Sequence, residues 1–312
     1  ISFMRFFVFL FLLLLTFNSF AQSGRVNPNA SVNQTGANSA GEPSVQQLYE
    51  EARTYFTTKL TEFEQKKIPY SAKLERQTLI EQKQLAAKNA AIAARRTNLA
   101  NEDFYYLGLL HWSSENLDGA AENFAKFSAL ENPQISKLQT ARSVLAVVAA
   151  RQKKFDEAEK ILDEYLKTDP VKLSERALIE SELAKSYYAL KNYEKAAPHA
   201  SEAFRAKKAL FQDSPSRAKG LDELVDVGIT VFKIYRDGAK IDEADYALED
   251  LKKTAAFVGS PSMYFYAVDK QIKYKIETAR KTAALQDYQN SLLETAKYFP
   301  QKSQQIDAIE RL

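Results

Sequence analysis

Apolar residues recur at helical spacing from residue 45 onward, with polar residues between them. The first such stretch predicts a helix that Ser44 caps and Pro69 ends. A second long helix is expected over about 71–97, where polar residues dominate and only a narrow stripe can be buried. The apolar positions of the first helix are Val45, Leu48, Tyr49, Ala52, Tyr55, Phe56, Leu60 and Phe63.

A five-residue phrase then recurs as NLDGA at 116–120, KFDEA at 154–158, NYEKA at 192–196 and KIDEA at 240–244. Each copy has an apolar residue, an acid, any residue and alanine in the same order. The first three copies begin 38 residues apart, which indicates an internal repeat. We interpret the phrase as the start of the second helix of a helix pair. An acid in that first turn is favoured by the helix dipole, by roughly 0.3–1 kcal/mol.

Small residues keep the same strict spacing and are expected to let the two helices of a pair approach closely. On the first helix they are Gly108, Ala146 and Ala184, and on the second Ala120, Ala158 and Ala196. Larger residues, among them Leu107, Phe124, Leu162 and Tyr187, should fill the space beside them. Each pair leaves an apolar side uncovered, which the next pair would bury.

These motifs resemble the tetratricopeptide repeat. The best copy reads Phe104-x2-Leu107-Gly108-x2-His111, then Ala120-x3-Phe124, then Pro133. The resemblance covers about 101–210 well and 220–299 weakly. A tetratricopeptide unit has about 34 residues, so each copy here is about one helical turn longer. The resemblance implies an all-α fold, an α-α superhelix in which antiparallel helix pairs form a solenoid.

Three features depart from the repeat. Pro198 falls inside the expected second helix of the third copy, where we expect a kink or a late helix start. In the fourth copy Phe232 occupies a position where a small residue is expected, which argues against close helix contact there. The spacing between copies also changes from 38 to 48 residues, measured from Ala184 to Phe232. A fifth copy near Ala279 is only suggested.

Composition supports a folded helical protein and narrows its partners. Hydrophobic residues make up 45% and aromatic residues 12% of the 312-residue chain, which is enough for a core. The 43 basic and 40 acidic residues nearly balance, so a nucleic-acid partner is not indicated. The chain has no cysteine, which excludes disulfides, thiol catalysis and thiolate metal sites within it.

The N-terminus has the pattern of a secretory signal peptide. Arg5 precedes an apolar run of 12 residues, and Ser19 and Ala21 lie where a signal peptidase reads small residues. We expect cleavage after Ala21, no stable membrane insertion afterwards, and export to a bacterial periplasm or the medium. The alternative is an uncleaved anchor, although the run is short for a span of about 20 residues. Residues 22–44 are expected to be a disordered linker.

Candidate chemistry is sparse. We expect His111, at a packing position, to be partly buried and structural, and His199 to lie on the surface. No metal-ligand spacing and no Gly-rich phosphate loop occurs. We therefore predict no catalytic residue, no cofactor and no metal.

The predicted functional surface is a concave groove lined by the first helices, which would bind a protein or peptide. Projecting the helical period places nine residues there: Tyr105, Leu109, Trp112, Ser143, Val147, Arg151, Ser181, Lys185 and Tyr188. Trp112 and Arg151 are of the types that anchor interfaces. The alternative is that Trp112 packs against the preceding helices and the groove is partly filled. The basic and Asn set that clamps a peptide carboxylate in chaperone-binding tetratricopeptide proteins is absent, which disfavours that ligand.

The layout as a whole resembles the helical N-terminal part of exported bacterial thioredoxin-like (TlpA/ResA type) proteins. This resemblance is carried by EARTYFTTKLTEFEQKKIPY, FYYLGLLHW and KYFPQKSQQIDAIERL. The leading hypothesis is an exported, non-enzymatic scaffold, and the alternative is an accessory region of a thiol-disulfide oxidoreductase whose catalytic domain lies beyond Leu312. The expected organisation is 1–21 signal peptide, 22–44 linker, 45–100 long helices, 101–210 three repeats, and 211–312 degenerate repeats and C-terminal helices.

Overall fold

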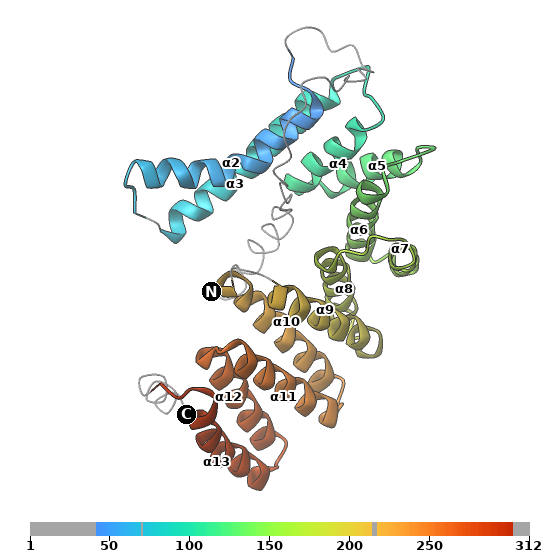
Figure 1. The fold of residues 1–312 in the computed structure, drawn as a ribbon. Coiled ribbons are helices and arrows are strands. Elements are labelled where there is room, and N and C mark those ends of the chain that lie inside the picture. The colour runs from blue at the N-terminus through green and yellow to red at the C-terminus, as the bar shows by residue number, and fades with distance from the viewer. Residues whose placement is uncertain (1–41, 70, 214–216, 302–312) are drawn as a thin grey trace. The chain divides into compact units, whose positions relative to one another are not determined.

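The computed structural model describes residues 42–69, 71–213 and 217–301. Within these ranges every regular element is a helix, which confirms the predicted all-α class. The helices (Figure 1) are α2 (Val45–Gln65), α3 (Ala72–Ala94), α4 (Asp103–Ser113), α5 (Leu117–Ser128), α6 (Ile135–Arg151), α7 (Phe155–Leu166), α8 (Leu173–Ala189), α9 (Tyr193–Asp213), α10 (Arg217–Asp237), α11 (Ile241–Val258), α12 (Pro261–Glu277) and α13 (Lys281–Tyr298).

The chain divides into two compact units, Ile1–Val171 and Lys172–Leu312. Unit 1 contains α2–α7 and unit 2 contains α8–α13. The expected signal peptide and most of the expected linker lie outside the described residues. In the part of the chain that the structure describes, no helix is both long and apolar enough to cross a membrane.

The α2–α3 hairpin is held by a small apolar seam and by buried amides. Ser44 caps α2 as predicted, in a capping box with Gln47. The Gln82 side chain donates to the carbonyls of Ala52 and Arg53, and Asn89, seven residues later on the same face, donates to the carbonyl of Leu48. These bonds pair the buried amide nitrogens of Gln82 and Asn89 with backbone carbonyls of α2.

Five consecutive helix pairs follow: α4–α5, α6–α7, α8–α9, α10–α11 and α12–α13. All five contain the same three-residue turn. Its middle residue is left-handed, with φ between 56° and 62°, and the residue after it donates its N–H to the carbonyl five residues earlier. This is the Schellman pattern, which usually favours glycine at the left-handed position. The left-handed residues are Glu115, Lys153, Lys191, Ala239 and Ala279.

The recurring phrase begins the second helix of each pair, as predicted. Its acid lies in the first turn of α5, α7, α9 and α11. Its alanine is fully buried in all four: Ala120, Ala158, Ala196 and Ala244. In α12–α13, where the sequence only suggests a copy, Ala284 holds the equivalent place and is 3% exposed.

Close approach of the paired helices is confirmed at Gly108. A Cβ on Gly108 would lie 2.9 Å from two ring carbons of Phe124, which is itself fully buried. The α10–α11 pair also packs closely, contrary to the expectation drawn from Phe232. Gly228, one turn earlier, takes the small-residue role there, since a Cβ on it would lie 2.7 Å from Leu251 Cδ1.

Of the two outcomes expected at Pro198, a kink or a late helix start, the late start is wrong and the kink stays a prediction. α9 begins at Tyr193 and continues through Pro198. It has 21 residues against 12 in α7, so it extends nine residues beyond the length of its counterpart. Residues 205–213 form this extension, which lies between the third and fourth copies of the phrase and accounts for most of their wider spacing.

Candidate functional site

The predicted groove residues of unit 1 are mostly covered. Leu109 and Trp112 are 7% and 8% exposed, while Ser143 and Val147 are fully buried. Arg151 is half-buried, with its guanidinium carbon 5.6 Å from the centre of the Trp112 ring. Trp112 and Arg151 therefore contact each other within unit 1.

The half-buried Tyr105 has aromatic neighbours in unit 1. Its ring centre lies 5.3 Å from those of Tyr106 and Phe127 and 6.0 Å from that of Phe124. Tyr105 therefore contributes to the packing of α4 on α5.

The predicted groove residues of unit 2 follow the same trend. Ser181 is buried, and Lys185 and Tyr188 are half-buried. The Tyr188 hydroxyl donates to Asp237 on α10, and burial together with this bond raises the pKa of Tyr188 to about 12. Five of the nine residues are thus buried and four half-buried, and a groove built from them stays a prediction.

The two histidines have structural partners. His111 is half-buried as expected; its Nδ1 lies 3.1 Å from the Asn116 amide nitrogen, and burial lowers its pKa. His199 is not on the surface, contrary to expectation. Its ring stacks on Tyr187 at 9°, and its Nδ1 lies 2.7 Å from Oε2 of Glu180, whose side chain is only 4% exposed.

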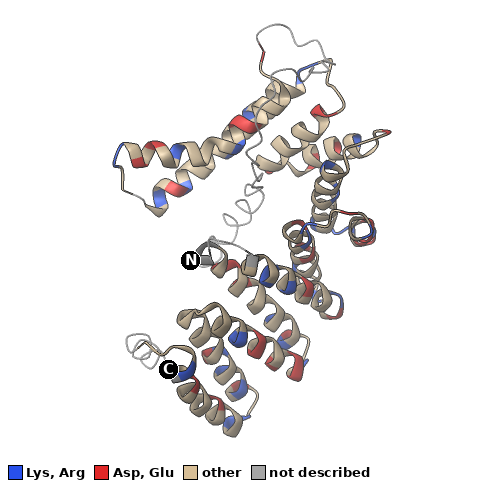
Figure 2. Ribbon diagram, in the orientation of Figure 1, with Lys and Arg blue, Asp and Glu red and all other residues tan. Residues whose placement is uncertain are grey.

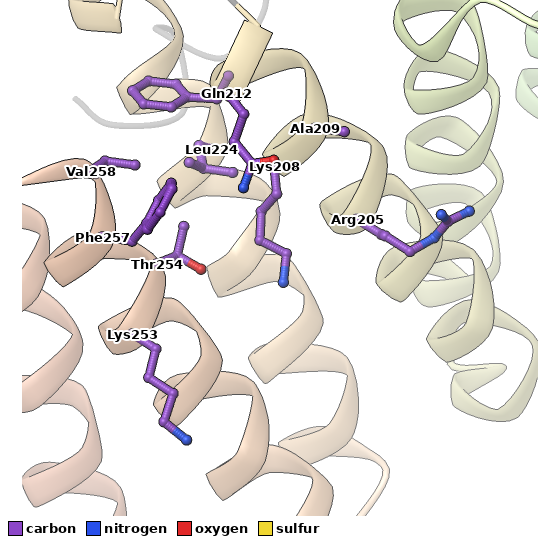
Figure 3. Close-up of a pocket in the computed structure, with 10 residues that line it drawn as sticks. Arg205, Lys208, Ala209, Gln212, Leu224, Lys253, Thr254, Phe257 and Val258 are labelled. Carbon is purple, nitrogen blue, oxygen red and sulfur yellow. The ribbon is translucent and has the colours of Figure 1, made fainter.

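Across residues 42–69, 71–213 and 217–301, no three His, Cys, Asp or Glu side chains are grouped in a way that could hold a metal ion. The candidate site of this chain is instead a pocket in unit 2, between α9, α10 and α11 (Figure 3). It is open to solvent and has a volume of about 400 Å³, and the described residues that line it are Arg205, Lys208, Ala209, Phe211, Gln212, Leu224, Lys253, Thr254, Phe257 and Val258. Five of these residues belong to the extension of α9.

The pocket has an apolar side, and one of its residues is unusually exposed to solvent. Leu224 and Phe211 are buried beneath it, at 1% and 7% exposure. Phe257, on the last turn of α11, is 73% exposed. Burying a phenyl group stabilises a protein or complex by about 1.5–3 kcal/mol. Because the Phe257 ring is exposed, this free energy is available for a contact with a ligand.

Among the lining residues whose side chains the structure describes, the charged ones are Arg205, Lys208 and Lys253. Lys208 Nζ lies 2.7 Å from Oδ2 of Asp250 and 4.7 Å from the centre of the Phe204 ring, which fixes the ammonium between α9 and α11. Figure 3 shows Lys208 pointing into the space between the two helices, whereas the Arg205 side chain extends away from the other labelled lining residues. Elsewhere on the described surface Lys, Arg, Asp and Glu are interleaved (Figure 2).

Arg205 and Lys253 each share a carboxylate with a second cation. Glu202 is 2.6 Å from Arg205 and 2.7 Å from Arg176, and the bond from Arg205 lowers the pKa of Glu202. Glu249 is 3.0 Å from Lys252 and 3.6 Å from Lys253. The second cation of each group also faces a further carboxylate, Glu180 at 3.6 Å from Arg176 and Glu294 at 3.4 Å from Lys252, so the charges within each group balance.

Sequence reasoning missed this pocket because its residues lie outside the repeat motif. The available signal was the departure from the 38-residue spacing, together with RAKKALFQD at 205–213.

Comparison with known proteins adds little. No family model and no curated protein matches this chain. Among solved structures, the crystal structure of BtubC (BKLC) from P. vanneervenii aligns with a TM-score of 0.40 and 14% identity, over 80% of this chain and 90% of that one. This likeness is distant and carries no inference about function.

Proposed function

We propose that this chain is an exported helical-repeat scaffold of the tetratricopeptide type that binds a protein or peptide and has no catalysis of its own. The repeated turn and the buried alanine of each helix pair support the repeat. Export rests on the sequence pattern around Arg5 and Ala21. The single observation that carries the binding role is the pocket of unit 2, where Phe257 lies 73% exposed beside an apolar floor.

A peptide library presented to the full chain tests this proposal. Peptides selected by the chain should lose roughly tenfold in affinity, measured by fluorescence anisotropy, when Phe257→Ser removes the exposed aromatic anchor. Tyr246→Ser is a matched control, because Tyr246 is a 71% exposed aromatic residue on the same helix and does not line the pocket. Failure of the folded chain to select any peptide would overturn the proposal.

Export is tested separately by sequencing the N-terminus of the protein recovered outside the cytoplasm. A chain that begins at Gln22 supports cleavage after Ala21. A chain that still contains Arg5 and remains in the membrane fraction contradicts it.

A further inference from the structure

We propose that residues 302–312 begin a further helix, which packs on an open apolar face of α13. This open face consists of Leu285, Tyr288 and Leu292, and the segment 302–312 lies outside the described residues. The inference is independent of the proposed binding function. It follows from the exposure of the open face, the point where the chain leaves α13, and the sequence after Pro300.

The open face runs along one side of α13. Its three residues are spaced three and four apart, so they lie above one another on the helix. Leu285 is 57% and Tyr288 37% exposed, and Leu292 is half-buried. Figure 1 shows α13 beside α12 at the edge of unit 2, and among the described residues no helix follows α13.

The matching position is covered in second helices that are followed by a further pair within the same unit. Phe124 in α5, Ala200 in α9 and Leu248 in α11 each lie four residues after the alanine of the recurring phrase, as Tyr288 follows Ala284. All three are at most 1% exposed. Tyr288 therefore has the exposure expected of a repeat whose following helix lies outside the described residues.

Polar contacts show how a following helix packs on the second helix before it. Gln152 of α6 donates to Asp118 of α5 at 3.1 Å, and Lys207 Nζ of α9 lies 2.6 Å from Oε2 of Glu223 on α10. Asp118 is near the start of α5 and Gln152 at the end of α6, so these two helices run antiparallel. The same arrangement would place a following helix along α13.

Phe299 fixes the point where the chain leaves α13. It is 1% exposed, and its ring centre lies 5.3 Å from that of Tyr264 and 6.2 Å from that of Phe265, both on α12. A helix that begins near residue 302 and returns antiparallel to α13 extends about 16 Å by residue 312. Tyr288 lies about 15 Å from Tyr298 along α13, so the segment is long enough to cover it.

The sequence after α13 resembles the sequence that begins α6. PQKS at 300–303 differs in one residue from PQIS at 133–136, and α6 begins at Ile135. In the same register Ala308 takes the place of Ala141, which is fully buried in α6. This match favours a helix that starts shortly after Pro300.

The segment also has apolar residues to place on the open face. Ile306, Ile309 and Leu312 recur every three residues and so share one side of a helix. A second copy of the chain is the competing occupant. Because only a few residues join the segment to α13, its effective concentration at the open face is on the order of millimolar, which favours the segment over a second copy.

Thiol labelling of the full chain tests the proposal, because the native chain has no cysteine and one introduced thiol reports on one position. The rate of each variant with DTNB is divided by its rate in urea, which removes differences in intrinsic reactivity. We expect Ile309→Cys and Tyr288→Cys to react roughly tenfold more slowly than Glu310→Cys and Gln289→Cys. Gln289 is a matched control, because it is exposed beside Tyr288 and lies off the open face.

Ile306→Asp, added to Tyr288→Cys, should release the segment and raise the labelling rate roughly tenfold. Gln304→Asp, at a polar position of the segment, should leave the rate unchanged. Equal corrected rates for Ile309→Cys and Glu310→Cys, or for Tyr288→Cys and Gln289→Cys, would overturn the proposal. Protection of Tyr288→Cys that grows with protein concentration and survives Ile306→Asp would overturn it in favour of a second copy.

Discussion

Gly108 and Phe124 show how the repeat depends on single atoms. The sequence predicts the residue types at this contact because small and large residues recur in register. It cannot predict that a Cβ on Gly108 would lie only 2.9 Å from the Phe124 ring, since this depends on how α4 and α5 settle against each other. The same reasoning placed Ala120, Ala158 and Ala196 correctly in the core.

We expect Gly108→Ala to lower the free energy of unfolding by about 1–3 kcal/mol, because the added methyl group overlaps a fully buried ring. Greater helix propensity of alanine offsets part of this loss, by about 1 kcal/mol. Urea denaturation of Gly108→Ala, Phe124→Leu and the double variant measures the coupling. If the losses of unfolding free energy in the two single variants simply add up in the double variant, the two residues are not coupled, which would contradict a direct clash.

His111 gives the stability of unit 1 a dependence on pH. Burial lowers its pKa in the folded state, and its Nδ1 faces the Asn116 amide nitrogen, which can donate only to an unprotonated ring nitrogen. As pH falls through the unfolded value of about 6.5, the unfolded chain binds the proton first, so stability decreases. His111→Gln should flatten this decrease between about pH 7 and 5 in urea titrations. An unchanged slope relative to the native chain would show that His111 does not contribute.

His199 is a residue whose exposure could not be predicted from the sequence. Its position after Pro198 suggests a surface residue, yet it is paired with Glu180, a buried acid of α8. The partner is 19 residues away in the sequence and on another helix, so only packing brings the two together.

At the scale of the element, the Schellman turn is the most regular feature of the fold. The sequence pattern predicts where the second helices of four pairs begin but not the type of turn before them, because none of the five turns has glycine at the left-handed position. Lysine, glutamate and alanine are tolerated there since the flanking helices fix the turn geometry.

Lys153 is the turn residue that best tests the free-energy cost of placing a residue other than glycine at the left-handed position. It is exposed and has a φ of 62°, a conformation that is unfavourable for a residue with a Cβ. Lys153→Gly should raise the free energy of unfolding by about 0.5–1 kcal/mol, and Lys153→Val should lower it by about 1 kcal/mol. Lys160→Gly, at an exposed position inside α7, should instead lower it by about 1 kcal/mol. Equal effects of glycine at both positions would contradict this account.

For the whole molecule, the division into two units predicts that unfolding is not a single transition. Trp112 is the only tryptophan and lies in unit 1, whereas far-UV circular dichroism reports helices of both units. Tryptophan fluorescence and circular dichroism should therefore give different midpoints in urea.

A variant of each unit sharpens this prediction. Leu248 is fully buried in unit 2, so Leu248→Ala should lower the free energy of unfolding of that unit by about 2–5 kcal/mol. Part of the circular dichroism transition should then move to lower urea concentration, while the fluorescence midpoint stays in place. Gly108→Ala should move the fluorescence midpoint. Superimposable curves for the native chain and both variants would mean that the two units unfold together.

The extension of α9 has a consequence for protein engineering. Consensus design averages the copies of a repeat and retains what they share, such as the buried alanine. The second helices of the first two pairs, α5 and α7, have only 12 residues, so averaging toward them would discard residues 205–213 along with half of the lining of the pocket. A consensus version of this array would be expected to fold well and to lack the pocket.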